Sequence, residues 1–173
     1  MRVLLEWIAW GADPDDPAEL GEGENRGPTL QLLEDDTYGR KIGRAYIFAD
    51  RYSIAKAEAT AGFLSRTEGY PETEAQQLAL DDSTDYAQLY NAMSRAVGRI
   101  RRSLADTKDV EFLVNVSPGY PQAQTIWFIL VNSDKLDATL LQTIEPNKAR
   151  ELGIRQVREV RLDLEPYRRG NWL

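Results

Sequence analysis

The segment from Val114 to Thr143 constrains the fold of this chain more than any other. It reads VNVSPGYPQAQTIWFILVNSDKLDATLLQT and predicts a strand, a tight turn, an apolar helix and a second strand. The first strand, predicted over Glu111–Val116, ends at Pro118-Gly119, where the backbone must turn sharply. Pro121 suits the first turn of a helix, because proline has no N–H to leave unpaired there. Such a turn directs free N–H groups and the positive end of the helix dipole outward, which favours an anion such as a phosphate.

Strand-like and helix-like segments alternate along the rest of the chain, which indicates a mostly parallel sheet covered by helices. The clearest helix is Thr84–Leu104, whose apolar residues recur near helical spacing on one stripe. Further strands are predicted at Val3–Trp10, Arg44–Asp50, Gln77–Leu80 and Asp137–Gln142, and further helices at Ser53–Ser65 and Thr29–Leu33. An acidic loop is predicted over 12–28 and a polar loop up to Asn147. Val157–Leu164 is predicted to be an edge strand with one solvent-exposed face.

The composition fits one globular domain and narrows its chemistry. The chain has 173 residues, of which 42% are hydrophobic and 28% charged, so it can bury a sizeable core. It contains no cysteine and no histidine, which removes disulfides, thiolate chemistry, the usual general base and the commonest metal ligand. The metal ligands that remain are carboxylates and carbonyls, which suit magnesium or calcium and not zinc. We predict no metal and no cofactor.

The charge and hydropathy of the chain bear on its partners. A net charge of −7 argues against binding long nucleic acid through a broad basic surface, but it permits a small phosphate-bearing ligand at one local site. No apolar run approaches the ~18 residues that a membrane span needs. We expect a soluble, cytoplasmic protein that does not bind membranes.

The stretch FLVNVSPGYPQAQTIWFILVNSDKLDATLLQT resembles the core motif of the CRISPR-associated Rossmann-fold (CARF) domains, which sense cyclic oligoadenylates. Within that group the chain is most similar to the sensor domain of the regulators of RNA-terminal phosphate cyclase. Three further segments fit the same pattern in the same order: GPTLQLLEDD at 27–36, LALDDSTDYAQLYNAM at 78–93 and VREVRLDL at 157–164. The resemblance implies an α/β, Rossmann-like three-layer sandwich, with a mostly parallel central sheet, helices on both faces and an edge strand near the C-terminus.

Ligand-binding residues are predicted beyond the carboxyl ends of the strands, where ligands bind in open parallel sheets. At the turn, the Ser117 hydroxyl and the N–H groups of Gly119 and Tyr120 can hold phosphate oxygens, and the Tyr120 ring can stack on a base or ribose. Pro118 lies in the same turn and is also predicted to contact the ligand. The alternative interpretation is that the turn only connects a strand to a helix and binds no ligand.

Further candidates come from the other strand ends. The resemblance implies a ligand loop after the first strand, although Trp10 has the alternative of capping the core. Arg51 is the preferred charge partner for a phosphate, whereas Asp81 and Asp82 have the alternative of capping the next helix. Glu6 lies inside an apolar strand, and two roles remain open for it: pairing with an arginine or facing a dimer interface. The additional predicted ligand-binding residues are Trp10, Gly11, Ala12, Asp50, Arg51, Asp81, Asp82, Gln122, Gln124, Gln142 and Thr143, with Tyr52 expected at the same edge.

The resemblance implies a homodimer that binds a cyclic oligoadenylate, tetra- or hexa-adenylate, across its two-fold axis and controls an effector in type III CRISPR antiviral defence. In this family an effector domain normally follows the sensor, so residues 1–165 are predicted to form the sensor and 166–173 a tail or linker. Two alternatives stay open. One is a ring nuclease that cleaves the ligand with Ser117, Tyr120 and Arg51 as positioned donors, although no catalytic residue is assigned. The other is a sensor of RNA ends that carry a cyclic phosphate.

Overall fold

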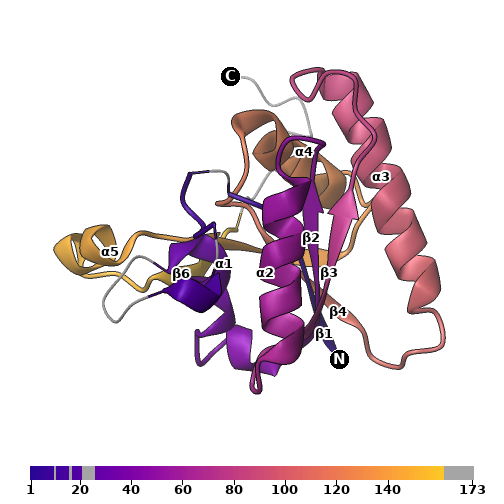
Figure 1. Cartoon of the computed structure of the whole chain (residues 1–173). Helices are drawn as coiled ribbons and strands as arrows, with labels where there is room; N and C mark the ends of the chain where they lie inside the picture. Colours follow the sequence, from indigo (N-terminus) through magenta and orange to yellow (C-terminus); the bar gives the residue numbers. More distant parts are fainter. Residues whose placement is uncertain (10, 16, 21–25, 162–173) are drawn as a thin grey trace, which may run out of the picture.

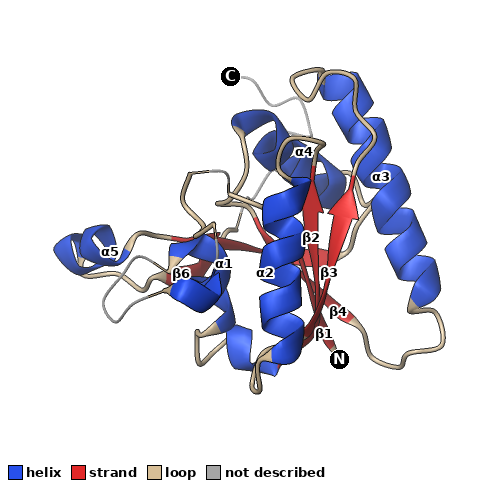
Figure 2. Cartoon of the chain, viewed as in Figure 1, coloured by secondary structure: helices blue, strands red, loops and turns tan. Residues whose placement is uncertain are grey.

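A six-stranded sheet forms the centre of the computed structural model, which describes residues 1–9, 11–15, 17–20 and 26–161 (Figures 1 and 2). Its strand order is β3-β2-β1-β4-β5-β6. The first five strands run parallel to their neighbours, and β6 is antiparallel to β5. The strands are β1 Arg2–Trp7, β2 Ile42–Ala49, β3 Glu72–Gln77, β4 Glu111–Asn115, β5 Ala138–Thr143 and β6 Val157–Glu159.

Helices cover both faces of the sheet, so the predicted fold class is confirmed. In Figures 1 and 2, α1 (Gly27–Leu33) and α2 (Ile54–Arg66) lie over one face, while α3 (Tyr86–Ser103) and α4 (Pro121–Asn132) lie over the other. The short α5 (Pro146–Leu152) joins β5 to β6 at the sheet edge. The chain winds outward from β1 in one direction and, after α3, from β4 in the other. This reversal between β1 and β4 opens a crevice at their carboxyl ends.

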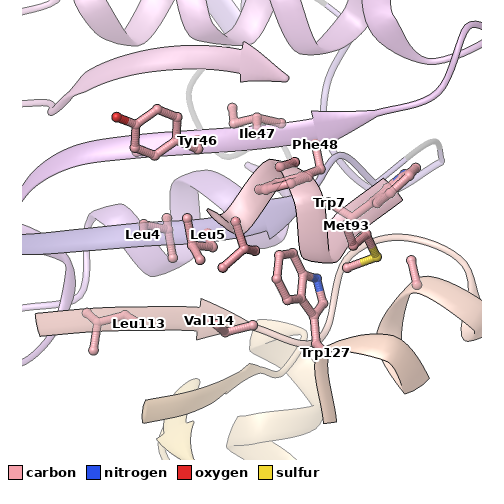
Figure 3. Close-up of a cluster of buried hydrophobic side chains, with 14 of the residues drawn as sticks. Leu4, Leu5, Trp7, Tyr46, Ile47, Phe48, Met93, Leu113, Val114 and Trp127 are labelled. Carbon is pink, nitrogen blue, oxygen red and sulfur yellow. The ribbon is translucent and has the colours of Figure 1, made fainter. Parts of the chain in front are cut away.

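Aromatic and aliphatic side chains from the central strands and from α3 and α4 form the core (Figure 3). Trp127 of α4 is fully buried, and its ring meets the edge of Phe48 from β2 at a centroid distance of 5.1 Å. Burying an aromatic side chain of this size stabilises the fold by roughly 2–3 kcal/mol. The contact fixes α4 against the sheet, and with it the position of the turn that precedes the helix.

Two element predictions are wrong. The strand predicted over Gln77–Leu80 lies earlier, as β3, because Glu72–Gln77 (ETEAQQ) is a polar edge strand without an apolar run. Leu78 and Leu80 are buried just beyond its end. The polar loop up to Asn147 instead contains the start of α5, which begins at Pro146, with the Glu145 carboxylate accepting hydrogen bonds from the first free N–H groups.

The predicted edge strand Val157–Leu164 is present in a shorter form, because β6 covers only Val157–Glu159. It does lie at the edge of the sheet, as predicted. Residues 162–164, like the predicted tail at 166–173, lie outside the described residues. None of the helices in the described ranges is long and apolar enough to cross a membrane.

Candidate functional site

A cavity of about 490 Å³ opens at the carboxyl ends of β1, β2 and β4, where the winding direction reverses. Aromatic rings, small apolar residues and three serine hydroxyls contribute to its wall. It is lined by Trp7, Ile8, Ala9, Gly11, Ala12, Pro28, Asp50, Tyr52, Ser53, Ser83, Ser117, Pro118, Gly119 and Tyr120. The structure therefore brings together seven of the predicted ligand-binding residues: Gly11, Ala12, Asp50, Ser117, Pro118, Gly119 and Tyr120.

The turn after β4 is seated on Trp7. Gly119 adopts a φ of +88°, and a Cβ built on it would lie 2.8 Å from the Trp7 Cβ, so both the backbone conformation and the close approach require glycine. Tyr120 meets the same indole edge-on, with 5.0 Å between ring centroids. The turn is thus held rigidly at the rim of the cavity.

Side-chain contacts leave the turn with free donors. The Gln124 amide donates hydrogen bonds of 2.8 and 3.2 Å to the carbonyl oxygens of Ser117 and Gly119. Within the described residues, the N–H groups of Gly119 and Tyr120 donate to no protein atom. Because α4 begins directly afterwards at Pro121, these N–H groups and the positive end of the helix dipole lie together. The arrangement can receive an anion.

The Ser117 hydroxyl already has partners. It donates to the carbonyl oxygen of Thr143 at 3.0 Å and accepts from the Thr143 N–H at 2.8 Å. It therefore fastens the end of β4 to the end of β5. Its single hydrogen is used, so the Ser117 side chain contributes to the site through the shape of the turn.

Asp50 closes the start of α2. Its Oδ1 accepts hydrogen bonds from the N–H groups of Tyr52 and Ser53, both at 3.0 Å, and from the Ser53 hydroxyl at 2.8 Å. Its Oδ2 lies 3.5 Å from the Tyr120 hydroxyl. Burial, reinforced by the Asp50 carboxylate, raises the pKa of the Tyr120 phenol, while a hydrogen bond with Ser83 opposes the shift. Tyr120 therefore stays neutral and can both donate and accept.

Arg51 lies outside the cavity lining. Its guanidinium carbon is 4.7 Å from the centroid of the Tyr52 ring, and one guanidinium nitrogen donates to the Tyr52 hydroxyl at 2.6 Å. Tyr52 itself lines the cavity and is 64% exposed. The pair forms a flat, partly cationic surface at the rim, on which a nucleobase can stack.

The two aspartates after β3 are not part of the cavity lining, although Asp81 and Asp82 were both predicted there. The Asp82 carboxylate accepts hydrogen bonds from the N–H and the hydroxyl of Thr84, at 2.8 and 2.7 Å, and these bonds lower its pKa. Asp85 caps α3, accepting from two N–H groups of its first turn. Of this segment only Ser83 lines the cavity. The sequence offered helix capping as the other role for these aspartates. Asp82 organises the turn before α3, and the cap of α3 is Asp85.

Three of the remaining predicted residues border a second hollow of about 410 Å³ on the other side of Ser117. They are Gln124, Gln142 and Thr143. The Gln142 amide oxygen accepts from the Arg158 guanidinium at 3.1 and 3.2 Å. Gln122 lies half-buried at the start of α4 and lines neither hollow. Trp10 lies outside the described residues.

Some cavity residues were not predicted from the sequence. Trp7 is hidden inside a strand, and Pro28, Ser53 and Ser83 belong to segments that looked like ordinary helix starts. Ser53 follows Asp50 by three residues and Ser83 follows Asp82 by one. This position shortly after a strand-end aspartate was the sequence signal that could have identified the two serines as site residues.

A buried carboxylate pair lies beneath the cavity. Glu6 of β1 is 0% exposed and Asp13, which follows β1, is 5% exposed. The Asn115 amide donates to Glu6 Oε2 at 2.9 Å. Burial and then the charge of Asp13 raise the pKa of Glu6 to about 8, and burial also raises the pKa of Asp13. Glu6 has no arginine partner among the described residues, and it is buried within the single chain, so it does not face a dimer surface.

Comparison with known proteins adds a family and a fold. The family model described as regulator of RNA terminal phosphate cyclase matches residues 20–171. The fold is similar to that of Csm6 from Enterococcus italicus, solved bound to cyclic hexa-2'-fluoro-hexa-dAMP, with a TM-score of 0.66 at 12% identity. The match covers 94% of this chain and 41% of that one, so the chain spans less than half of the Csm6 length. No curated protein matches the sequence.

Proposed function

Because this chain belongs to the family of regulators of RNA terminal phosphate cyclase, we propose that it is a sensor domain whose cavity binds a cyclic oligoadenylate. The observation that carries the proposal is the 490 Å³ cavity between β1 and β4, which combines aromatic walls with free N–H donors at the turn. The similarity of fold to a Csm6 structure that contains a cyclic hexanucleotide supports this ligand class.

The cavity suits a base next to a phosphate. Tyr52 and Tyr120 offer ring faces or edges, and stacking a base on an aromatic side chain contributes about 1–3 kcal/mol. The N–H groups of Gly119 and Tyr120, at the start of α4, suit the adjoining phosphate. The exposed Arg51 guanidinium lies beside Tyr52 and is placed to approach a phosphate at the rim.

A two-fold symmetric ligand requires two matching half-sites, so we propose that two chains associate with their cavities facing each other. Each half of a tetra- or hexa-adenylate ring then meets the same residues. Ligand binding changes the geometry of the dimer. This change is transmitted to an effector domain in type III CRISPR defence. In this proposal residues 1–165 form the sensor and residues after 165 lead toward the effector.

A second candidate ligand is an RNA end that carries a cyclic phosphate. The family match favours it, because the description of the family refers to an enzyme that acts on RNA terminal phosphates. The same N–H donors can hold a terminal cyclic phosphate. The net charge of −7 favours the small closed ring over a long RNA.

A thermal-shift titration separates the candidates. We would titrate the protein with cyclic tri-, tetra- and hexa-adenylate and with a short RNA ending in a cyclic phosphate. A ligand present at ~100 times its dissociation constant adds about 2.7 kcal/mol, which raises the melting temperature by roughly 5–10 °C in a chain of this size. A stable shift with one ring supports the sensor, and a shift that decays as linear products form indicates a ring nuclease. A response to the RNA end alone would overturn the cyclic ligand.

A further inference from the structure

The buried pair Glu6 and Asp13 connects the two walls of the cavity. Asp13 holds the first wall: its carboxylate accepts from the Ala9 N–H at 2.8 Å and from the Thr29 N–H at 3.0 Å. It thereby ties the segment after β1, which contributes Gly11 and Ala12 to the cavity, to the start of α1.

Glu6 holds the second wall through Asn115. The Asn115 amide donates to Glu6 Oε2, and the Asn115 Oδ1 accepts from the Ser117 N–H at 3.3 Å. Ser117 begins the turn that contains Gly119 and, through its hydroxyl, fastens the turn to Thr143. The position of the turn therefore depends on a carboxyl group buried beneath it.

The hydrogen atoms in this cluster do not suffice for two ionised carboxylates. The Thr29 hydroxyl has one hydrogen, which it donates to Asp13 Oδ2 at 3.1 Å, and its oxygen also lies against the Glu6 carboxyl. Glu6 Oε1 is buried and has no hydrogen-bond partner among the described residues. Protonation of Glu6 removes a buried negative charge that the few donors around it leave only partly compensated.

The surrounding charges do not replace that proton. Asp13 is the charged group that acts on Glu6, and its negative charge disfavours ionisation of Glu6. Lys56 of α2 acts on Asp13, and its ammonium forms an ion pair with Asp15 at 3.1 Å. Two like charges side by side in a dry site are strongly unfavourable, so one of the pair keeps its proton.

We propose that Glu6 keeps its proton in the presence of the Asp13 carboxylate, and that Glu6 is thereby a positioning residue that holds the turn after β4, one wall of the ligand cavity, in place. Loss of the proton at alkaline pH places two charges between the walls and loosens the turn that carries the free N–H groups. The ligand site is then sensitive to pH through a group that lies outside the cavity lining. This inference deepens the proposed function and rests on it where ligand affinity is concerned.

The first test needs no ligand. In the full chain labelled with ¹³C, the carboxyl signal of Glu6 is identified as the one that disappears in Glu6→Gln. We expect this signal to titrate with a midpoint near 8, and the Asn115 side-chain and Ser117 backbone amide signals to shift with it. A Glu6 midpoint below 6, or amide signals that do not follow it, would contradict the proposal.

The second test measures affinity for cyclic tetra- and hexa-adenylate between pH 6.5 and 9.5. The wild-type affinity is expected to fall by up to about tenfold per pH unit above the Glu6 midpoint, whereas Glu6→Gln, which mimics the protonated form, keeps its affinity. An equal loss in the variant would overturn the positioning role. If neither ring binds at any pH, the proposed function fails, while the carboxyl titration still decides whether Glu6 keeps its proton.

Discussion

Gly119 shows how narrowly single residues are constrained at this site. Its backbone conformation has a positive φ, and a Cβ added to it would lie 2.8 Å from the Trp7 Cβ. The two constraints are separate, because the first acts on the backbone alone and the second on packing between the turn and β1. Gly69 has a similar φ of +92°, but a Cβ added there would meet no atom within 4 Å, so Gly69 isolates the first constraint.

We expect Gly119→Ala to destabilise the fold more than Gly69→Ala. Both variants incur the cost of a left-handed backbone, about 1 kcal/mol or more. Only Gly119→Ala also forces Trp7 or the turn to move, which adds roughly 1–3 kcal/mol. Urea denaturation of the two variants measures the difference, and equal losses would show that the turn yields freely.

Tyr52 is the residue at which ligand stacking is most directly tested. Removing its ring with Tyr52→Ala is expected to weaken binding of the responsive ligand by about 5- to 150-fold, the equivalent of 1–3 kcal/mol of stacking. Tyr86→Ala is the matched control, because Tyr86 is also an exposed tyrosine, at 49%, and lies outside the cavity lining. Isothermal titration of both variants gives the comparison, and similar affinities would exclude Tyr52 from the site.

Glu6 also makes stability depend on pH. Because its pKa is raised in the folded chain, its contribution to stability is fully present below its ordinary pKa of 4.5 and is lost as the pH rises to about 8. The loss is at most about 1.4 kcal/mol per pH unit within that window. Chemical denaturation at several pH values should give a flatter profile for Glu6→Gln than for wild type. Parallel profiles would mean that Glu6 is ionised in the folded chain.

At the scale of elements, the site is built from the starts of helices that follow strands. The cavity collects residues next to the starts of α1, α2 and α4, and the segment before α3 adds Ser83. Two of these segments are organised by a local carboxylate, Asp50 before α2 and Asp85 before α3, whereas the turn before α4 keeps free N–H groups. The geometry of the cavity therefore depends on short-range hydrogen bonds as much as on the sheet.

The Asp85 cap can be tested separately from the site. Asp85 Oδ1 accepts from the N–H groups of Ala87 and Gln88 at 2.8 and 3.0 Å, so Asp85→Ala should cost about 1 kcal/mol of stability. Asp106→Ala is the control, since Asp106 is an exposed aspartate just after the same helix. Thermal denaturation distinguishes them. A loss as large in Asp106→Ala would indicate a general charge effect in place of capping.

Elements with strong local signals could be predicted from the sequence. The turn at Pro118-Gly119 and the helix that begins at Pro121 follow from residue chemistry that acts within a few positions. β3 could not be located, because its polar residues become a strand only by pairing with β2, far along the chain. The role of Ser117 was missed for the same reason, since its hydroxyl partner, Thr143, is 26 residues away.

For the whole molecule, the central question is how one chain accommodates a symmetric ligand. The cavity of about 490 Å³ can take one base with its sugar and phosphate more readily than an entire ring. In the proposed dimer each chain holds half of the ring, so neither cavity has to take the whole of it.

The dimer proposal predicts a defined stoichiometry. Titration of the protein with the responsive cyclic oligoadenylate should saturate at one ring for two chains, and sedimentation velocity should show a dimer in the presence of the ring. The linear oligoadenylate of the same length is the control, and it should bind more weakly because it is not held in the closed, two-fold form. Saturation at one ring per chain would contradict the shared site.

The central place of β1 in the sheet has a consequence for how the protein folds during its synthesis. Glu6 and its partner Asn115 are 109 residues apart, and β1 can be closed on its β4 side only after Asn115 has been made. At about 5–20 residues per second, the ribosome needs roughly 5–20 s for that stretch. During this delay Glu6 is in water and ionised, so completion of the nascent sheet includes the capture of a proton from the solvent.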